Sequence, residues 1–278
     1  MFFQKFRGAN TLEFSDMAAF ERQHAAIMKK PPHAEAATFY LSGFCGVCRR
    51  RSKFAVDYLY GGDIETRQPN YRERLVCTGC GLNSRLRASV SVLAESLSAK
   101  SDIYLTESVT PLFAALRRKF SRLTGSEFLR DGTPQGQVNA KGIRHEDLTA
   151  LSFPEATFDA VASFECLEHI PDYKAALREC RRVLRKGGRL FLTAPFLVNQ
   201  KTTTIRAFVD DLGDIQHLLE PEYHGDPVSE GGVLCFYHFG WSLLDDLIDA
   251  GFKHTSVLVL SDQYGGHVQP QFIFRAEA

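Results

Sequence analysis

The sequence predicts an α/β protein with a doubly wound, mostly parallel sheet, preceded by a small module built around cysteines. From residue 102 onward, short apolar segments alternate with amphipathic segments, which is the pattern of parallel strands joined by helices. Acidic residues follow the first three of these apolar segments, at the strand ends where ligands bind in such sheets. Two Cys-x-x-Cys pairs precede the sheet, and they define the module.

Composition excludes several classes of protein. In 278 residues, 33 Lys and Arg balance 33 Asp and Glu, so no overall positive field attracts nucleic acid. No apolar run approaches the roughly 18 residues that span a bilayer, and the first residues lack the apolar core of a signal peptide. We therefore expect a cytoplasmic protein with no membrane partner and no nucleic-acid partner.

An amphipathic segment opens the chain. Met17, Phe20, His24 and Ile27 recur at helical spacing behind Ser15 or Asp16 as the cap, so the sequence predicts one helix over residues 15–30. We assign residues 1–40 to this N-terminal helical segment.

Four cysteines have the spacing of a structural metal site. Cys45, Cys48, Cys77 and Cys80 form two Cys-x-x-Cys turns, and two such turns supply four thiolates in a tetrahedron, a set that suits zinc. Such a site is closed and therefore structural. The alternative is redox-active or unligated cysteines. Between the pairs, residues 54–62 and 72–77 are expected to be strands.

A helix is predicted to leave this module. Asn83 is its expected cap, and apolar residues recur on one face as far as Leu97. Arg85 and Arg87 are assigned to its solvated face. Residues 41–98 thus form the zinc-binding module with its exit helix. The other cysteines, Cys166, Cys180 and Cys235, share no ligand spacing and are expected to be buried and free.

Residues 99–278 form the predicted α/β domain. Its expected strands are 102–107, 125–129, 142–148, 158–164, 189–196, 253–260 and 271–276, and its expected helices are 111–120, 173–187 and 241–251. Glu107, Glu127 and Asp147 close the first three strands. An acid about 20 residues past the first turn commonly binds ribose hydroxyls in nucleotide-binding sheets.

Residues 145–196 carry a recognisable set of motifs. These are Asp147-Leu148, Leu151 to Pro154, Phe158-Asp159, Glu168 to Asp172, Arg182 to Leu184 and Gly187-Gly188. In this set the chain resembles the class I S-adenosylmethionine-dependent methyltransferases, in particular their type 11 domain group. The resemblance implies a Rossmann-like methyltransferase sheet over roughly residues 100–278 and S-adenosylmethionine as cofactor. Gly187-Gly188 would end the preceding helix.

The resemblance also implies roles for individual residues. Glu127 would hold the ribose hydroxyls, and Asp147 would accept a hydrogen bond from the adenine amino group with Leu148 packed nearby. Phe164 or Glu165 would border the methionine portion. His169 would flank the substrate pocket or, alternatively, cap the next helix.

The first turn departs from the family pattern because Ser108-Val109-Thr110-Pro111 replace its glycines. Glycines matter most where the backbone crowds a pyrophosphate, and a sulfonium cofactor has none. We expect binding to persist through Glu107, the hydroxyl of Ser108 or Thr110, and the amino end of a helix that begins at Pro111. The alternative is a degenerate domain that binds no cofactor.

Residues 197–241 are too long for a simple connection and are predicted to form a substrate lid. The candidates for chemistry in it are His217, Glu222, Tyr223, His224, Asp226, Tyr237, His238 and Trp241. We assign His224 as general base, oriented by Glu222 or Asp226, with His238 in reserve; the alternative is that these side chains only shape the lid. A second metal on His217, Glu222 and His224 would lack the helical ligand spacing of recognised sites.

The predicted function is S-adenosylmethionine-dependent methylation, at oxygen, of a small-molecule or sugar-like acceptor. A first alternative is an RNA methyltransferase with a zinc module. Its basic patch would comprise Arg49, Arg50, Arg51, Lys53, Arg72, Arg74, Arg85 and Arg87. A second alternative is a non-catalytic binding protein on a degenerate methyltransferase fold.

Overall fold

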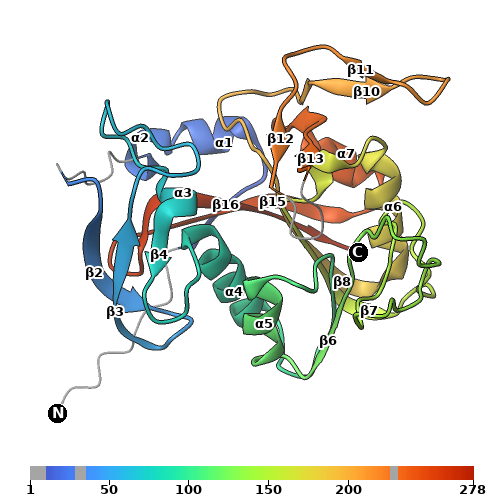
Figure 1. Ribbon diagram of the computed structural model, residues 1–278, viewed down its shortest axis with the longest axis horizontal. Coiled ribbons are helices and arrows are strands. Elements are labelled where there is room, and N and C mark those ends of the chain that lie inside the picture. The colour runs from blue at the N-terminus through green and yellow to red at the C-terminus, as the bar shows by residue number, and fades with distance from the viewer. Residues whose placement is uncertain (1–10, 29–35, 226–230) are drawn as a thin grey trace. The chain divides into compact units, whose positions relative to one another are not determined.

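The computed structural model describes residues 11–28, 36–225 and 231–278 and divides the chain into two compact units (Figure 1). Unit 1 contains Phe14 and the residues before it, Ala18–Leu97 and Leu258–Ile273. Unit 2 contains Ser15–Met17, Ser98–Val257 and Phe274–Ala278. Unit 1 is therefore assembled from an N-terminal stretch and from a segment near the other end of the chain.

Unit 1 contains a three-stranded antiparallel sheet. Its strands are β2 (Phe39–Cys45), β3 (Arg50–Val56) and β4 (Leu75–Cys77). The strand predicted over residues 72–77 is wrong in its first half, which forms the short helix α3 (Tyr71–Arg74). Tyr71 and Leu75 are buried in the same apolar cluster as Phe54 and Val268, so tertiary packing overrides the local strand pattern.

The single helix predicted over residues 15–30 is two short helices in the described part, α1 (Met17–Glu21) and α2 (His24–Ile27). Gln23, with φ of −116° and ψ of 0°, separates them. Phe20 packs edge-on against the rings of Phe14 and Phe272 at 5.5 and 5.9 Å between centroids. Residues 29–30 of the prediction lie outside the described residues. Strand β1 (Thr11–Phe14) precedes α1.

The exit helix is confirmed as α4 (Ser84–Ser96). Asn83 caps it, because its Oδ1 accepts a hydrogen bond from the backbone N–H of Leu86 at 2.9 Å. The described apolar core of unit 1 lies around the cysteines and includes Phe54, Val56, Leu75 and Val268.

The largest sheet among the described residues has seven strands in the order β1-β15-β16-β8-β7-β5-β6, and its strands β5, β6, β7 and β8 belong to unit 2. Besides β1, the strands are β5 (Asp102–Leu105), β6 (Arg122–Gly125), β7 (Phe158–Phe164), β8 (Leu184–Thr193), β15 (Lys253–Asp262) and β16 (His267–Glu277). β5, β6, β7 and β8 run parallel, and β16 is antiparallel to β8. The predicted α/β fold is therefore confirmed. The chain leaves β5 toward β6 and returns on the other side as β7, so the carboxyl ends of β5 and β7 form a switch point.

The described helices of unit 2 follow its strands. They are α5 (Pro111–Arg117), η1 (Leu167–His169), α6 (Tyr173–Val183) and α7 (Leu243–Asp249). The helix predicted to end at Gly187-Gly188 ends instead at Val183. The two glycines lie inside β8, where the register with β7 shifts and Gly187 has φ of +76°. The expected strand over residues 142–148 is reduced to isolated bridges at Arg144 and His145.

The lid is a series of short antiparallel pairs rather than an irregular loop. The pairs are β9 (Thr204–Ile205) with β14 (Tyr237–His238), β10 (Ala207–Val209) with β11 (Ile215–His217), and β12 (Tyr223–His224) with β13 (Val233–Leu234). Figure 1 shows the β10–β11 hairpin projecting from the rest of unit 2. Among the helices of the described residues, none combines the length and apolarity needed to cross a membrane.

Candidate functional site

The backbone conformation of the first turn, residues 106–111, does not require glycine. None of the residues from Thr106 to Pro111 has a positive φ, so the backbone needs no glycine for its conformation. The Thr110 hydroxyl donates a hydrogen bond to Glu107 and accepts one from the backbone N–H of Phe113 at 3.2 Å. Thr110 therefore caps α5 and fixes the Glu107 carboxylate at the end of β5.

Close backbone packing occurs instead at Gly125, the last residue of β6. A Cβ atom at this position would lie 2.4 Å from the Phe113 ring and 2.7 Å from the Glu107 carbonyl oxygen. No other residue fits without moving the turn or α5. In this chain, the position at this strand end that requires a glycine is therefore Gly125 of β6.

Glu127 joins these two strand ends. Its Oε1 accepts hydrogen bonds from the backbone N–H groups of Ser108 and Val109 at 2.6 and 3.0 Å. The residue is 7% exposed, and charge-assisted bonds of this length are strong. Glu107, Ser108, Thr110 and Glu127, all predicted cofactor residues, therefore lie together at the switch point.

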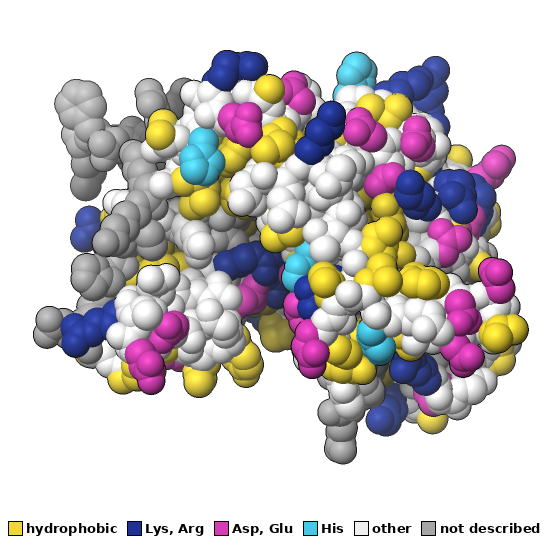
Figure 2. Space-filling view, turned by 90° about the horizontal axis from the view of Figure 1, so that it is seen from above, with side chains coloured by type: hydrophobic (Ala, Val, Ile, Leu, Met, Phe, Trp, Pro, Cys, Tyr) yellow, Lys and Arg dark blue, Asp and Glu magenta, His cyan; other side chains and the backbone are white. Residues whose placement is uncertain are grey.

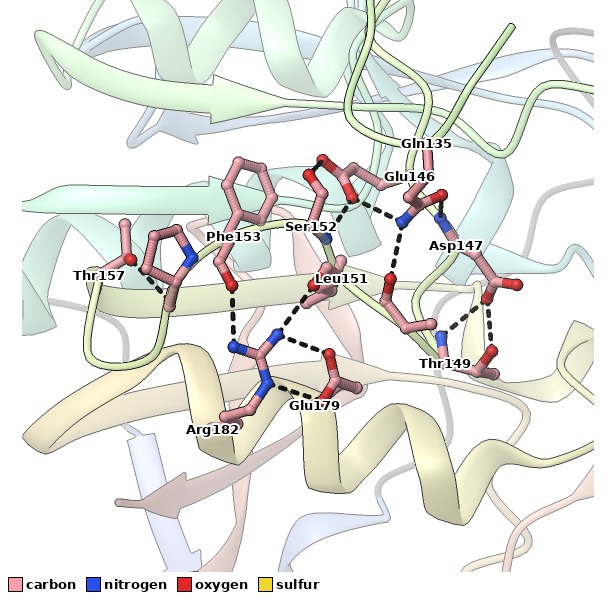
Figure 3. A network of polar contacts seen from close by, with 12 residues as sticks. Gln135, Glu146, Asp147, Thr149, Leu151, Ser152, Phe153, Thr157, Glu179 and Arg182 are labelled. Atoms are coloured by element: carbon pink, nitrogen blue, oxygen red, sulfur yellow. Dashed lines mark hydrogen bonds and ion pairs between the residues drawn. The ribbon is translucent and has the colours of Figure 1, made fainter.

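Asp147 lies in a polar network that holds residues 146–153 in place (Figure 3). One carboxylate oxygen, Oδ1, accepts from the N–H and the hydroxyl of Thr149 at 2.8 and 2.7 Å. The backbone N–H of Asp147 donates to Gln135 at 2.9 Å. The buried Glu146 accepts from Ser152, at 2.6 Å from its hydroxyl.

Arg182 of α6 anchors the other end of the same segment. Its guanidinium donates to the carbonyl oxygens of Phe153 and Leu151, each at 2.8 Å, and pairs with Glu179 at 2.7 Å (Figure 3). The Leu-x-Phe-Pro motif is thereby tied to the helix that carries the Arg-Val-Leu motif. Leu148, the predicted adenine contact, is buried.

The end of β7 is conformationally strained. Glu165 has φ of +51° although it is not glycine, a conformation that costs on the order of 1 kcal/mol and clusters at functional sites. Phe164 beside it is buried. Both were predicted to border the methionine portion of the cofactor, and they lie across the switch point from Glu107.

The helix η1 that follows holds a buried carboxylate that the sequence did not single out. Glu168 is fully buried, and neither of its carboxylate oxygens has a hydrogen-bond partner. Two imidazole nitrogens, His169 Nε2 and His224 Nδ1, each lie 3.6 Å from its Oε1. Burial raises the pKa of Glu168. The Nδ1–H of His169 donates to the carbonyl oxygen of Leu234 at 2.8 Å, which attaches it to the lid.

The lid brings its polar side chains together around Glu222. Glu222 Oε1 lies 2.9 Å from His224 Nε2 and 3.2 Å from His238 Nε2. Arg206 Nη2 lies 3.2 Å from the other oxygen, Oε2. Cys235 belongs to the same group, because its sulfur and the ligand atoms of Glu222 and His238 all lie within 4.8 Å of one another. We name Glu168, Glu222, His224, Cys235 and His238 the lid cluster.

Electrostatic coupling in the lid cluster favours charged imidazoles. Cys235, Glu168 and Glu222 raise the pKa of His224 to about 11, and Cys235 and Glu222 raise that of His238. The two histidines lower the pKa of Cys235 against the opposing effect of burial. Without a further cation, His224 is therefore protonated at neutral pH.

The four predicted zinc ligands of unit 1 converge. Cys45 and Cys80 sulfurs are 3.8 Å apart, as are those of Cys48 and Cys77. A tetrahedron with metal–sulfur distances of about 2.3 Å has edges of about 3.8 Å, so the spacing fits zinc. The N–H groups of Cys48 and Gly79 point at sulfurs of the cluster over 3.4 Å.

The thiols of this cluster differ in their pKa values. The hydrogen bond from the Cys80 thiol lowers the pKa of Cys45 to about 5, whereas burial raises that of Cys48 to about 11. The four sulfurs therefore do not ionise alike in the absence of a metal.

Arg87 corrects another prediction. It was assigned to a solvated helix face, yet it is 1% exposed. Its guanidinium donates to the carbonyl oxygens of Leu75, Leu82 and Gly266 at 2.7, 2.8 and 2.6 Å and lies 4.4 Å from the Phe54 ring centroid. It provides a buried positive charge beside the four cysteine sulfurs.

Much of the basic patch of the RNA hypothesis is neutralised in unit 1. Arg85 and Arg72 both pair with Glu73, at 2.8 and 2.5 Å, Arg74 pairs with Asp57, and Arg87 is buried. On the face shown in Figure 2, acidic and basic side chains are interspersed. The geometry gives the RNA hypothesis no separate support.

Some predicted lid residues do not join the cluster. His217 is exposed on β11, and the Trp241 indole N–H donates to the carbonyl of Val198 at 2.8 Å. Tyr223 is exposed, and the Tyr237 hydroxyl donates to the carbonyl of Pro171 at 2.5 Å. Asp226 lies outside the described residues. Glu168, Arg206 and Cys235 were missed, since no spacing along the chain connects them.

Comparison with known proteins places the methyltransferase motifs in a family. Residues 109–192 match the family model described as a methyltransferase domain. The ubiquinone biosynthesis O-methyltransferase of Xanthomonas oryzae pv. oryzae is 50% identical over 57 residues, 20% of this chain and 23% of that protein. That of Xylella fastidiosa is 32% identical over 130 residues, 47% of this chain and 45% of that protein.

Other matches are of the same kind. The 27-O-demethylrifamycin SV methyltransferase of Amycolatopsis mediterranei is 46% identical over 50 residues, 18% of each chain. The chain thus spans less than half the length of these curated relatives. A crystal structure of an S-adenosylmethionine-dependent methyltransferase from Mesorhizobium loti is 18% identical, covers 70% of this chain and 98% of that chain, and has a TM-score of 0.44. The methyltransferase domain that the motifs predicted is thus matched over residues 109–192 of this chain.

Proposed function

We propose that this chain methylates a small-molecule acceptor at oxygen, with S-adenosylmethionine as the methyl donor. The observation that carries the proposal is the convergence of Glu107, Glu127 and the strained Glu165 at the switch point of a sheet that contains the methyltransferase match. The relatives named as O-methyltransferases support oxygen as the methylated atom.

The residues at the strand ends fit the cofactor. Glu107 would hold its amino group, Glu127 its ribose and Asp147 its adenine amino group, with Leu148, Phe164 and His169 completing the pocket. When bound, S-adenosylmethionine supplies an electrophilic methyl group on a sulfonium. Glu127 also holds the first turn through Ser108 and Val109, so turn and ribose would share one carboxylate. The carboxylate of Glu127 would thus fix the backbone of a first turn that has no glycine.

The lid cluster would receive the acceptor. Glu222 Oε1, at 2.9 Å from His224 Nε2, would orient His224 as the general base. A histidine whose pKa is about 11 is protonated at neutral pH, so the neutral form that can act as a base becomes more abundant as the pH rises. If His224 acts alone as base, kcat/KM therefore rises with pH throughout the range from 7 to 10. A plateau that begins near pH 7 would show that another group takes the proton.

We also propose that Cys45, Cys48, Cys77 and Cys80 hold a structural zinc ion. The sulfur–sulfur spacing of 3.8 Å and the buried Arg87 support this assignment. All four ligands come from the protein, so the ion would stabilise unit 1 rather than take part in methyl transfer.

Calorimetric titration with S-adenosylmethionine and with its demethylated product, S-adenosylhomocysteine, tests the cofactor site. Wild-type protein should bind both, and Glu107→Gln should weaken binding by about tenfold or more because a charge-assisted hydrogen bond is lost. Glu155→Gln, which changes an exposed acid of unit 2, is the matched control and should bind as wild type. If neither compound binds the folded, metal-loaded protein, the binding-protein alternative takes precedence.

A further inference from the structure

We infer that Glu222, Cys235 and His238 are the ligands of a second metal site in the lid, one that binds a zinc-class divalent ion with a coordination position left open. This site is separate from the four cysteines of unit 1. It also differs from the set His217, Glu222 and His224, because His217 is exposed on β11.

The ligand atoms are already gathered. One oxygen of Glu222, the sulfur of Cys235 and a ring nitrogen of His238 lie within 4.8 Å of one another. His238 Nε2 is 3.2 Å from Glu222 Oε1. Ligands at about 2.0–2.3 Å from one ion lie roughly 3.3–3.8 Å apart, so small side-chain movements complete the set.

The chemistry of the donors selects the ion. A thiolate and an imidazole are ligands for zinc and for neighbouring transition metals, and they do not suit magnesium or calcium. Three protein ligands drawn from Cys, His and Glu are typical of zinc sites that keep a fourth position for water or substrate. An acceptor hydroxyl is the class of ligand that this open position would take, which rests on the proposed O-methylation.

A buried carboxylate adjoins the proposed site. Glu168 is fully buried with no hydrogen bond to either carboxylate oxygen, so its negative charge needs positive charge close by. It lies 3.6 Å from Nδ1 of His224, whose Nε2 contacts Glu222. A divalent ion at Glu222 would supply positive charge next to this chain of groups. His224 would then stand between the metal ligand and Glu168, in the place of an outer-sphere histidine.

The backbone pre-organises the site. The N–H of Cys235 donates to the carbonyl of Glu222, and the N–H of Phe236 donates to that of Glu168, each at 2.8 Å. Arg206 Nη2 lies 3.2 Å from Glu222 Oε2, which turns Oε1 toward the histidines. Three segments distant in sequence are therefore held in register before any ion binds.

Metal analysis of purified full-length protein tests the inference. After equilibration with zinc and removal of excess, Cys235→Ala should hold one zinc ion fewer per chain than wild type. Cys180→Ala is the matched control, since it also removes a buried thiol from unit 2, and it should hold as many as wild type. An unchanged zinc content in folded Cys235→Ala would overturn the inference.

A second pair keeps the test valid if Cys235→Ala fails to fold. In a chelator competition, His238→Gln should lower the affinity for the second zinc ion by 100-fold or more. His217→Gln, in the same lid, should leave this affinity unchanged. Equal affinity in both variants rejects the site. Cobalt substitution adds a readout, because the thiolate-to-cobalt absorption assigned to Cys235 should be absent from the difference spectrum of Cys235→Ala. None of these readouts requires S-adenosylmethionine, so failure here is distinguishable from failure of the methyltransferase proposal.

Discussion

The four-cysteine site of unit 1 and the lid cluster of unit 2 gather ligands in opposite ways. The cysteines come from two tight turns, and their spacing is visible in the sequence. The lid residues come from η1, β12, β14 and the segment between them, and only hydrogen bonds across the lid bring them together. Metal ligands that lie within short turns can be recognised from the sequence. Ligands that come from separate segments can be recognised only in the folded structure.

The two regions also treat histidine in opposite ways. In unit 1, burial and the nearby Arg87 lower the pKa of His267 to about 3, so it is neutral and shares a 3.0 Å hydrogen bond with Ser84. In the lid, Cys235 and two carboxylates raise the pKa of His224 to about 11. The sign of the neighbouring charge, rather than burial alone, decides the state of each imidazole.

The largest expected effect is the loss of stability when the four-cysteine site loses its metal. Cys77→Ser should release the zinc ion of unit 1 and destabilise that unit by roughly 5 kcal/mol or more, because metal binding and folding are coupled. Cys235→Ala should cost much less, since unit 1 keeps its ion. Metal content with thermal unfolding measures both. Equal destabilisation by the two substitutions would remove the distinction between the sites.

The next effect concerns the buried cation of unit 1. Arg87→Met removes one donor from each of three carbonyl oxygens and an aromatic contact from the core, and it should cost about 3–5 kcal/mol in the free energy of unfolding. The control is Arg85→Met, whose partner Glu73 is partly exposed, and it should cost about 1 kcal/mol or less. Urea unfolding compares them. Similar costs would mean that Arg87 acts as an ordinary helix residue.

A smaller effect follows from the neutral histidine. Because the folded-state pKa of His267 is depressed from 6.5 to about 3, its contribution is present above pH 6.5 and is lost as pH falls toward 3. The unfolded chain then binds one proton more, so stability falls by about 1.4 kcal/mol per pH unit below 6.5. His267→Gln should flatten this slope between pH 6.5 and 5.5, measured by urea unfolding, whereas His217→Gln should not change it.

The smallest effect lies at the adenine end of the predicted cofactor site. Asp147→Ala removes one hydrogen-bond acceptor and should weaken S-adenosylhomocysteine binding by about tenfold, or about 1.4 kcal/mol. The zinc content should stay at the wild-type value. Calorimetry with metal analysis gives both numbers. Loss of metal together with cofactor would mean that the substitution unfolds the chain.

These contrasts also mark how far the sequence could predict the molecule. Alternation of apolar segments predicted the sheet, because strand and helix periods are local properties. The Cys-x-x-Cys turns and the capping Asn83 are local in the same sense. Arg87 was misassigned because its partners include the carbonyl of Gly266, a contact that no pattern near residue 87 encodes. Glu168 was quoted only as part of a motif, since its isolation from hydrogen bonds exists only in the folded chain.

The glycine-free first turn is an intermediate case. The sequence showed that its glycines were replaced, and the helix expected to begin at Pro111 is present as α5, capped by Thr110. It could not show that Gly125 provides the close approach, because that contact is to Phe113 and the Glu107 carbonyl on another element. Which position needs a glycine thus depends on the packing of the folded chain.

The segment 258–273 in unit 1 has a consequence for synthesis. Arg87 and Ser84 both bond to the carbonyl of Gly266, 182 residues beyond Ser84, and the N–H of Phe44 donates to the carbonyl of Tyr264 at 2.7 Å. At about 5–20 residues per second, the ribosome delivers these partners roughly 10–40 seconds after the cysteines. During that interval the thiols emerge without the contacts that complete their unit. Early capture of zinc would protect them from oxidation until the last strands arrive.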